Sequence, residues 1–277
     1  TTPKVYMQNG FDNQVLASMN IKRVPKINLR KWNKVVNSIN NPKSEVNIAV
    51  VGKYIGLKDA YKSLTEALTH GGIANKVKVN IHWLDSEAIK NKNDLRGLKK
   101  MNGILVPGGF GKRGVEGKIL AINYARINKI PYFGICFGMQ LAVIETARNQ
   151  AGVKGASSSE FSKRKNSVIG LMTEWEKDQK KFTRDDESDY GGTMRLGSYP
   201  AILKSNSLVS SIYKSKNIQE RHRHRYEVNI NYKSNLEKFG LKFTGLSPDG
   251  LLTEAVELEG HPWFIGVQFH PELKSRP

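Results

Sequence analysis

The stretch Ile130-Pro-Tyr-Phe-Gly-Ile-Cys136-Phe-Gly-Met-Gln-Leu-Ala-Val-Ile-Glu-Thr-Ala-Arg-Asn149 decides the fold. Its first part is a short apolar run rich in residues that favour β-strands, and its last part has apolar residues at helical spacing. Between them stands Gly-x-Cys136-x-Gly, in which the two glycines allow the backbone to turn sharply without a Cβ clash. Strand, glycine-flanked cysteine and helix together are the pattern of a nucleophile elbow.

Cys136 is the only cysteine of the chain. At the first turn of a helix its sulfur meets unpaired N–H groups and the positive end of the helix dipole, which favours a thiolate over a thiol. The alternative interpretation is that Cys136 is a small buried apolar residue, as a lone cysteine often is. This stretch alone leaves both interpretations open.

Composition sets the broad class. A chain of 277 residues with 39% hydrophobic residues can bury one good core and a small appendage. No apolar run approaches the roughly 20 residues of a membrane span, and the first residues lack the apolar region of a signal peptide. A single cysteine excludes an internal disulfide framework and fits a reducing compartment. We therefore expect a cytoplasmic protein that does not enter a membrane.

The formal net charge of +19 is large. A charge of this sign can mark a nucleic-acid or nucleotide partner. The lysines, however, are scattered along the chain and do not form a stripe. We therefore favour an evenly charged, solvated surface and expect no nucleic-acid partner.

Residues 1–43 differ in composition and hydrophobic pattern from the rest of the chain. They are polar and asparagine-rich, with short helical patterns at 16–19 and 29–39, and Asn41-Pro42 is typical of a helix stop. We expect this segment to be a tether or interdomain linker, and residues 44–277 to form the main domain.

From Val46 onwards, strand patterns alternate with helix patterns. The expected strands are 46–52, 77–83, 103–109 and 130–135, and the expected helices are 59–70, with Gly71-Gly72 as its C-terminal stop, and 115–126. This spacing predicts an α/β fold with a doubly wound, mostly parallel sheet, whose functional site lies at the carboxyl ends of the strands.

Beyond Gly152 the pattern loosens. Residues 173–190 are densely charged and are expected to form a surface loop. Strands are expected at 193–203, 218–232 and 251–258, with a short helix at 207–213. The last strand pattern, 263–272, ends on polar groups. We expect an antiparallel β portion to be added to the parallel sheet.

A cysteine nucleophile needs a base, a group that orients the base, and donors for an oxyanion. His270 ends an apolar strand, and Glu272 follows two residues later, where it can hold the other ring nitrogen. The backbone N–H of Phe137 lies next to the nucleophile, and that of Gly109 comes from a glycine-rich turn after an adjacent strand. The sequence thus offers one candidate for each role.

These motifs carry a resemblance to a known family. Gly-Ile-Cys136-Phe-Gly-Met-Gln140, the turn Pro107-Gly-Gly-Phe-Gly111 and Gln-Phe-His270-Pro-Glu272 resemble the class I glutamine amidotransferase family. Further stretches resemble the amidotransferase domain of the CTP synthase family; they are Val51–Ser63, His70–Gly72, Arg113–Gly117, Gly191–Gly197 and Arg221–Asn229. The resemblance covers residues 14–277, and residues 14–45 resemble the end of a synthetase domain with its linker.

The resemblance implies roles for individual residues. Cys136 would form a γ-glutamyl thioester with L-glutamine, while His270 and Glu272 complete a Cys-His-Glu triad. Gly109 and Phe137 would supply the oxyanion N–H groups. The residues implied to line the glutamine site are Gly109, Phe137, Gly138, Met139, Gln140, Glu160, which takes the α-ammonium, and Arg225, which takes the α-carboxylate. Arg113 and Glu116 would belong to a mobile lid that responds to GTP.

The resemblance also implies partners and cofactors outside this chain. Ammonia would pass to a synthetase (amidoligase) domain, where UTP is aminated to CTP with ATP and Mg²⁺, with GTP as activator and in a homo-oligomer, a tetramer. No cofactor is implied for this domain itself. The chain departs from the family in three ways: it contains no Gly-x4-Gly-Lys-Ser/Thr loop, it ends before the family's C-terminal helix, and it has Phe137 where leucine is usual.

Other functions are weighed against this one. Another class I amidotransferase or a γ-glutamyl hydrolase would share the triad, but would give no reason for the resemblance of 191–197 and 221–229. A non-catalytic assembly module is supported only by the missing helix and Phe137. A metal site at His222 and His224 is disfavoured, because the flanking residues are cationic or aromatic and no acid or thiol cluster accompanies them. We therefore expect no metal.

Overall fold

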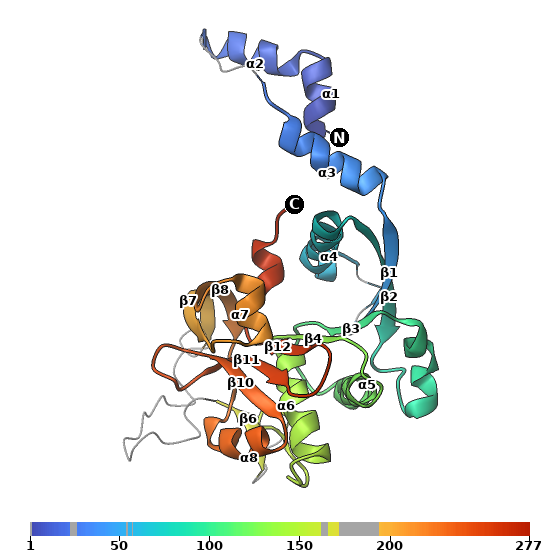
Figure 1. Ribbon diagram of the computed structural model, residues 1–277, viewed down its shortest axis with the longest axis vertical. Coiled ribbons are helices and arrows are strands. Elements are labelled where there is room, and N and C mark those ends of the chain that lie inside the picture. The colour runs from blue at the N-terminus through green and yellow to red at the C-terminus, as the bar shows by residue number, and fades with distance from the viewer. Residues whose placement is uncertain (1, 23–26, 54, 57, 162–165, 172–193) are drawn as a thin grey trace.

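The computed structural model describes residues 2–22, 27–53, 55–56, 58–161, 166–171 and 194–277. The charged segment 173–190, expected to be a surface loop, lies outside these residues, as do residues 191–193. The N-terminal helices project away from a compact body that holds all of the strands (Figure 1).

One nine-stranded sheet runs through the body, in the order β2-β1-β3-β4-β12-β11-β10-β7-β8. Its parallel part consists of β1 (Ser44–Gly52), β2 (Val77–Asp85), β3 (Gly103–Val106), β4 (Tyr132–Ile135) and β12 (Phe264–Val267). Its antiparallel part consists of β7 (Arg195–Leu203), β8 (Asn217–His224), β10 (Leu241–Leu246) and β11 (Thr253–Leu258). The predicted mostly parallel sheet with added antiparallel strands is confirmed.

A second, three-stranded sheet lies beside the first. It is made of β5 (Ser157–Ser158), β6 (Ser167–Gly170) and β9 (Glu227–Val228). Because β9 follows β8 after a short bend, this small sheet connects the antiparallel part of the large sheet to the segment after α6.

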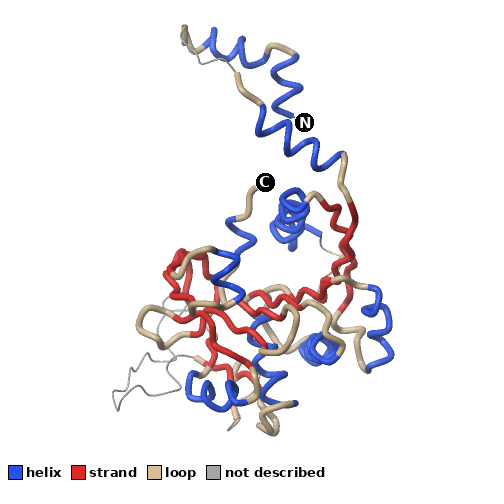
Figure 2. Tube along the Cα trace, in the orientation of Figure 1, coloured by secondary structure: helices blue, strands red, loops and turns tan. Residues whose placement is uncertain are grey.

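Helices cover both faces of the large sheet (Figure 2). On one face lie α4 (Lys62–Asn75) and α7 (Leu208–Tyr213), and on the other lie α5 (Val115–Ile127), α6 (Phe137–Asn149) and α8 (Lys233–Lys238). Short 3₁₀ turns complete the body at Lys58–Tyr61, Lys92–Lys100, Ile230–Tyr232 and Pro271–Lys274.

The strands are apolar on both faces because helices cover both. In β1, Val50 packs in a cluster with Leu64 of α4, whereas the next residue, Val51, packs in the cluster that contains α5 and α6. Residues i and i+1 of a strand point to opposite faces, so a strand covered twice reads as a continuous apolar run. This explains why Asn47-Ile-Ala-Val-Val51 shows no alternation in the sequence.

The predicted stop of the first helix at Gly71-Gly72 is wrong. The helix α4 begins at Lys62, after a 3₁₀ turn, and continues through both glycines to Asn75. An added Cβ at Gly72 would lie 2.6 Å from the carbonyl oxygen of Val77, the first residue of β2. Gly72 therefore serves close packing of the helix against the strand that follows it, and does not end the helix.

The predicted strand 218–232 is also corrected. Only Asn217–His224 belongs to the large sheet; the chain then bends, forms the short β9 in the other sheet, and enters a 3₁₀ turn and α8. The prediction missed β10 and α8. The helix expected at 207–213 is confirmed as α7, whose N-cap Ser207 accepts a hydrogen bond from the backbone N–H of Ser210 at 3.1 Å.

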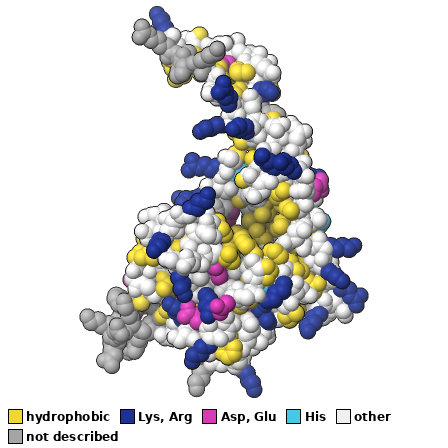
Figure 3. Space-filling view, viewed as in Figure 1, with side chains coloured by type: hydrophobic (Ala, Val, Ile, Leu, Met, Phe, Trp, Pro, Cys, Tyr) yellow, Lys and Arg dark blue, Asp and Glu magenta, His cyan; other side chains and the backbone are white. Residues whose placement is uncertain are grey.

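The N-terminal segment forms α1 (Thr2–Gln8), α2 (Phe11–Ser18) and α3 (Arg30–Asn40), and none of these helices contains a buried residue. No helix among the described residues is both long enough and apolar enough to span a membrane. On the face seen in Figure 3, lysine and arginine side chains are dispersed over the surface, as the sequence pattern predicted.

Candidate active site

Cys136 lies at the turn between β4 and α6, with φ 51° and ψ −102°, a backbone conformation that is rare for a residue with a side chain. Its N–H donates to Val267 O at 2.6 Å. An added Cβ at Gly138 would lie 2.1 Å from Val106 O, and one at Gly134 would lie 2.6 Å from the Tyr132 hydroxyl. The flanking glycines thus let the start of α6 pack closely against β3 and β4 and hold the strained residue, as in a nucleophile elbow.

His270 and Glu272 lie just beyond β12, the strand that pairs with β4. His270 Nδ1 donates to Glu272 Oε1 at 2.7 Å, so Nε2 is the nitrogen left for proton transfer. Burial lowers the pKa of His270, but the neighbouring Cys136 sulfur and Glu272 carboxylate raise it by more than burial lowers it. The net result is a pKa of about 9. His270 Nε2 is buried and has no hydrogen-bond partner among the described residues.

A pocket of about 720 Å³ brings these groups to solvent. Cys136, which is only 4% exposed, lines the pocket together with His270 and Glu272, so its sulfur is deep but not sealed in the interior. The remaining lining residues come from the end of β1, the start of α4 and the turn before it, the glycine-rich turn after β3, α5, the residue before β7, β8 and the 3₁₀ turn after β12. They are Lys53, Asp59, Ala60, Tyr61, Lys62, Ser63, Leu64, Pro107, Gly108, Gly109, Phe110, Lys118, Met194, Arg223 and Leu273.

The two expected oxyanion donors lie near each other, since an added Cβ at Gly109 would lie 3.7 Å from Cδ1 of Phe137. Gly109 lines the pocket, and its neighbour Gly108 approaches the ring of His270 so closely that an added Cβ would lie 2.7 Å from Cε1. Phe137 is the first residue of α6. Because the first intrahelical bond runs from Gln140 N to Cys136 O, the N–H groups of the preceding turn have no carbonyl partner within the helix.

The Phe137 side chain does not line the pocket. Its ring is 2% exposed and packs edge-on against Phe161, with ring centroids 5.9 Å apart. The ammonium of Lys118 lies 5.0 Å from the centroid of the same ring. Phe137, which stands where the resemblance implies leucine, thus packs in the interior behind the turn.

Lys118 is a feature that the sequence prediction missed. The residue is 1% exposed and lines the pocket. Burial and the charge of Lys53 together lower the pKa of its amine to about 7. A Cβ added to Gly109 would lie 3.7 Å from the Nζ of Lys118, which puts this amine beside the candidate oxyanion turn. The signal was present: Lys118 lies on the apolar face of its helix, three residues after Val115 and four before Ile122.

Glu160 and Gln140 reach the site from behind the pocket wall. Glu160 Oε1 accepts from the N–H of Gly111 at 2.6 Å, and burial raises its pKa. Gln140 is 4% exposed, and its Nε2 donates to Tyr226 O at 2.8 Å and to Gln268 Oε1 at 3.1 Å. Neither side chain lines the pocket in this structure.

The other predicted glutamine contacts lie near the same wall. Gly138 and Met139 are buried in the first turn of α6. Arg225 lies half-buried in the bend between β8 and β9, beside Tyr226, whereas the arginine that lines the pocket is Arg223. Their roles toward glutamine stay predictions.

The predicted lid residues are held by ion pairs outside the pocket. Arg113 Nη2 lies 2.6 Å from Glu87 Oε1, and Glu116 Oε2 lies 2.9 Å from Arg148 Nη1. Gly114, between them, has φ 68° and an added Cβ there would lie 2.3 Å from Ser86 Oγ. Whether this turn moves stays a prediction.

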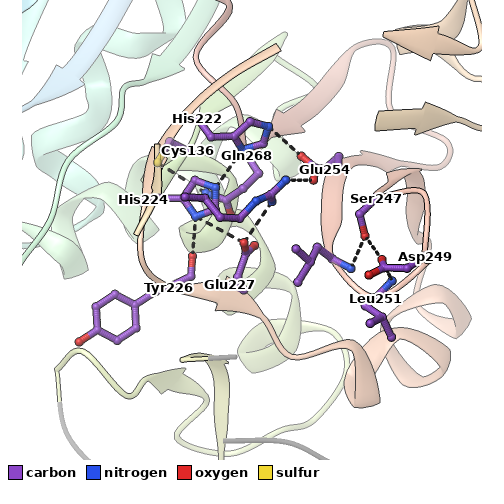
Figure 4. Close-up of polar contacts among 12 residues, drawn as sticks. Cys136, His222, His224, Tyr226, Glu227, Ser247, Asp249, Leu251, Glu254 and Gln268 are labelled. Carbon is purple, nitrogen blue, oxygen red and sulfur yellow. Dashed lines mark hydrogen bonds and ion pairs between the residues drawn. The ribbon is translucent and has the colours of Figure 1, made fainter. Parts of the chain in front are cut away.

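A buried ionic cluster, formed by side chains of β7, β8, β9 and β11, lies behind the site (Figure 4). Arg195 contacts Glu227 at 3.1 Å and Glu254 at 2.8 Å, and both carboxylates are almost fully buried. His222 Nε2 lies 3.3 Å from Glu254 Oε2, and His222 Nδ1 lies 2.9 Å from His224 Nε2. Burial lowers the pKa of His222 to about 3 and raises that of Glu227 to about 8.

The described residues contain no group of three or more His, Cys, Asp or Glu side chains arranged to hold a metal ion. In the cluster behind the site, His224 Nδ1 donates to Tyr226 O at 3.1 Å, and its Nε2 accepts from His222. The two histidines therefore serve a hydrogen-bond network.

Comparisons with known proteins agree with this geometry. The profile of the family "Glutamine amidotransferase class-I" matches residues 56–277. The CTP synthases of Brucella anthropi and Rhizobium johnstonii are 58% and 59% identical to the chain over 275 residues, which is 99% of this chain and 51% of each relative. The chain thus spans about half the length of the curated relatives it matches.

Among solved structures, the chain is similar to the Trypanosoma brucei CTPS glutaminase domain with bound acivicin. The two are 40% identical, with a TM-score of 0.74, and the match covers 84% of this chain and 88% of that one. An elbow cysteine, a histidine paired with a glutamate, and a glycine-rich turn meet in one pocket on the fold of these relatives. The chain therefore belongs to the class I glutamine amidotransferase family, as a glutaminase domain of the CTP synthase type.

Proposed function

We propose that this chain hydrolyses L-glutamine through a covalent thioester on Cys136. The observation that carries the proposal is the placement of Cys136, His270 and Glu272 in one pocket, with His270 Nδ1 donating to Glu272 Oε1 at 2.7 Å. This leaves Nε2 directed away from the carboxylate, as a triad requires. The bound acivicin of the related glutaminase domain, a glutamine analogue, supports the same substrate.

The chemistry follows from the positions of the groups. The Cys136 thiolate attacks the side-chain amide carbon, and the N–H groups of Gly109 and Phe137 hold the resulting oxyanion. The His270 imidazolium gives its proton to the departing nitrogen, so that ammonia leaves and the thioester remains. Neutral His270 then takes a proton from water, whose oxygen attacks the thioester and releases glutamate and the thiolate.

The glutamine contacts belong to the same proposal. Glu160 takes the α-ammonium, Arg225 takes the α-carboxylate, and the first turn of α6 contacts the side-chain amide. Burial raises the pKa of Glu160, while the Gly111 N–H and Lys53 lower it. A cationic α-ammonium beside it would favour the carboxylate further.

The fate of the ammonia extends the proposal to the whole protein. We infer that a synthetase domain, outside this chain, uses the ammonia with ATP and Mg²⁺ to convert UTP to CTP in the cytoplasm. GTP would activate the hydrolysis through the turn that contains Arg113 and Glu116, and the full enzyme would be a tetramer. The support is the likeness to CTP synthases about twice the length of the chain.

Release of ammonia and glutamate from L-glutamine tests the first part. We expect measurable hydrolysis by the chain, and a loss of at least about 10³-fold in kcat in Cys136→Ala and in His270→Asn, because the triad acts as a unit. His82→Asn is the matched control, since His82 is exposed on β2 and its ring forms a hydrogen bond with Asn47 Oδ1, away from the pocket. Hydrolysis that survives Cys136→Ala would contradict the proposal.

Two further measurements separate this function from its rivals. A glutamine-mimicking electrophile is expected to label Cys136 and no other residue; a non-catalytic module would remain unlabelled. GTP is expected to change the rate of hydrolysis, which a γ-glutamyl hydrolase would not predict. The chain alone, supplied with UTP, ATP and glutamine, is expected to form no CTP.

A further inference from the structure

Gln268 is a fully buried polar side chain that the roles assigned so far do not use. It is 0% exposed and lies two residues before His270. Val267 and Phe269, on either side of it, pack into the cluster around α7, so Gln268 faces the opposite side, where α6 begins. Its Nε2 lies 3.5 Å from Cys136 Sγ (Figure 4).

Backbone pairing between β4 and β12 places Gln268 beside the sulfur of Cys136. In the parallel pair of β4 and β12, Ile135 lies opposite Val267, so the next residue on each strand is Cys136 and Gln268. Cys136 N donates to Val267 O at 2.6 Å, and Gln268 N donates to Glu254 O of β11 at 2.9 Å. Gln268 is thus held from both neighbouring strands, and its position does not depend on a loop.

The orientation of the amide follows from a backbone carbonyl. Tyr226 O can only accept, so the end of Gln140 that lies 2.8 Å from it is the NH₂ group. The same NH₂ group lies 3.1 Å from Gln268, so the atom of Gln268 that it meets is the acceptor Oε1. The opposite end of the Gln268 amide, which faces the sulfur, is therefore an N–H donor.

Tyr226 O is held in turn by a second donor. His224 Nδ1 donates to it at 3.1 Å, and His224 Nε2 accepts from His222. The chain of hydrogen bonds that orients the Gln268 amide therefore begins at His222 and His224 of β8, the edge strand of the large sheet. Both hydrogens of the Gln140 amide are engaged within the protein, so its NH₂ group is not free to contact a substrate.

We propose that Gln268 is a further catalytic residue, whose side-chain N–H stabilises the Cys136 thiolate, and that Gln140 is a positioning residue that turns this donor toward the sulfur. The inference rests on the proposed thioester mechanism. A hydrogen bond to an anion is stronger than one to a neutral group, so the donor favours the thiolate before attack. It acts again when the sulfur leaves the second tetrahedral intermediate and regains its charge.

The pH profile of alkylation tests the donor without any need for hydrolysis. Because Cys136 is the only cysteine, iodoacetamide reports on this sulfur alone. In Gln268→Met, which fills a similar volume without a donor, we expect the midpoint of the alkylation profile to move up by about one pH unit. The alkylation rate near neutral pH then falls about tenfold.

Two controls keep the test decisive. Gln268→Glu keeps length and polarity but replaces the donor by an oxygen, and it is expected to move the midpoint in the same direction; it carries the test if Gln268→Met does not fold. Gln219→Met, at an exposed position of β8, is expected to keep the profile of the unaltered chain. An unchanged midpoint in folded Gln268→Met or Gln268→Glu would overturn the proposal.

A double variant tests the positioning role. Gln140→Leu is expected to give a smaller shift in the same direction, and Gln140→Leu combined with Gln268→Met is expected to match Gln268→Met alone, because the two side chains act in series. Additive shifts would overturn the role of Gln140. Iodoacetamide is small and neutral, so this comparison does not depend on the binding of glutamine.

Measurements of glutamine hydrolysis then separate the failure of the Gln268 donor from the failure of the proposed function. Since Gln268 contacts the sulfur and does not line the pocket, Gln268→Met is expected to lower kcat about tenfold with KM for glutamine changed less than about twofold. If the chain shows the expected alkylation shifts but no hydrolysis, the proposed function fails and the donor stands. If hydrolysis is robust but both kcat and the alkylation profile of Gln268→Met are unchanged, the donor alone fails.

Discussion

At the scale of single residues, the state of the site at neutral pH depends on opposing influences on His270. Burial disfavours the imidazolium, whereas the sulfur of Cys136 and the carboxylate of Glu272 favour it, and the net effect raises the pKa to about 9. Below that pH the ring carries a proton that it can give to the departing ammonia. Because the pKa lies above the usual value of 6.5, the associated stabilisation is full below pH 6.5 and is lost as the pH rises to about 9.

This arrangement predicts the alkaline limb of the activity profile. kcat/KM for glutamine hydrolysis is expected to fall as the pH rises through about 9, since the proton donor is then lost. In Glu272→Gln the limb is expected to move to lower pH by about one unit, because a carboxylate that favours the charged ring is removed. Initial rates measured between pH 6 and 10 check both expectations.

The control for that experiment is Glu259→Gln, which removes an exposed carboxylate whose ion-pair partner is Lys242. Its profile is expected to match that of the unaltered chain. An alkaline limb that stays in place in Glu272→Gln would show that Glu272 does not set the charge of His270.

A second residue-scale prediction concerns the buried cluster behind the site. Arg195→Met leaves the carboxylates of Glu227 and Glu254 without their cation, and loss of one partner of a buried ion pair costs about 3–5 kcal/mol. Burial already raises the pKa of both carboxyl groups. Without the arginine they bind protons more tightly still, so the loss of stability is expected to be larger at pH 8.5 than at pH 6.

Urea unfolding at the two pH values measures this difference. The companion variant Glu254→Gln, which removes a charge but keeps the shape, is expected to cost less than Arg195→Met at both. If Arg195→Met lowers the free energy of unfolding equally at pH 6 and pH 8.5, the charges of Glu227 and Glu254 do not depend on Arg195.

At the scale of elements, α4 contains two adjacent glycines with opposite surroundings. An added Cβ at Gly71 meets nothing within 4 Å, whereas one at Gly72 lies 2.6 Å from Val77 O. We expect Gly71→Ala to raise the free energy of unfolding by about 0.5–1 kcal/mol, because alanine favours the helix. Gly72→Ala is expected to lower it by about 1–3 kcal/mol, because the backbone of β2 must move.

Thermal or urea unfolding of the two single variants checks this pair, and each serves as the control of the other. If both substitutions stabilise the protein, α4 does not pack against the start of β2 as described. If both destabilise it, Gly71 has a contact that the described residues do not contain.

The elements differ in how far local sequence predicts them. Strands covered by helices on both faces, such as β1 and β3, have continuous apolar runs and were predicted within a few residues. The segment 218–232 was predicted as one strand, because its bend at Arg225 and its transfer into the second sheet depend on the partner strand β6. At Gly71-Gly72 the pattern of a helix stop was misleading, since a glycine needed for close packing looks the same in a sequence.

For the site, the residues at turns were predicted and those that act through packing were not. Cys136, His270 and Glu272 stand in motifs that mark them, and the structure brings them to one pocket. Lys118 is a polar residue on the apolar face of its helix, a signal that the sequence already contains. The contact of Gln268 with Cys136 can be recognised only once the register of β4 and β12 is known. Arg223 lines the pocket and Arg225 does not, and the sequence could not predict this because it depends on how the chain bends after β8.

At the scale of the whole molecule, the N-terminal segment has little part in the stability of the body. No residue of α1, α2 or α3 is buried, and these helices extend away from the sheet (Figure 1). We expect a variant that begins at residue 44 to unfold cooperatively, with a loss of less than about 1 kcal/mol, which is about 2–4 °C in Tm for a domain of this size. Calorimetry of the two forms measures it, and a loss of cooperativity would show that α3 supports the fold.

The solitary thiol of the chain has a consequence for damage by peroxide. A thiolate reached through an open pocket is the form that peroxide oxidises to a sulfenic acid. With no other cysteine in this chain, that product has no internal thiol with which to form a disulfide. Recovery must therefore come from an external thiol small enough to enter the pocket, and without one the sulfur proceeds to irreversible oxidation.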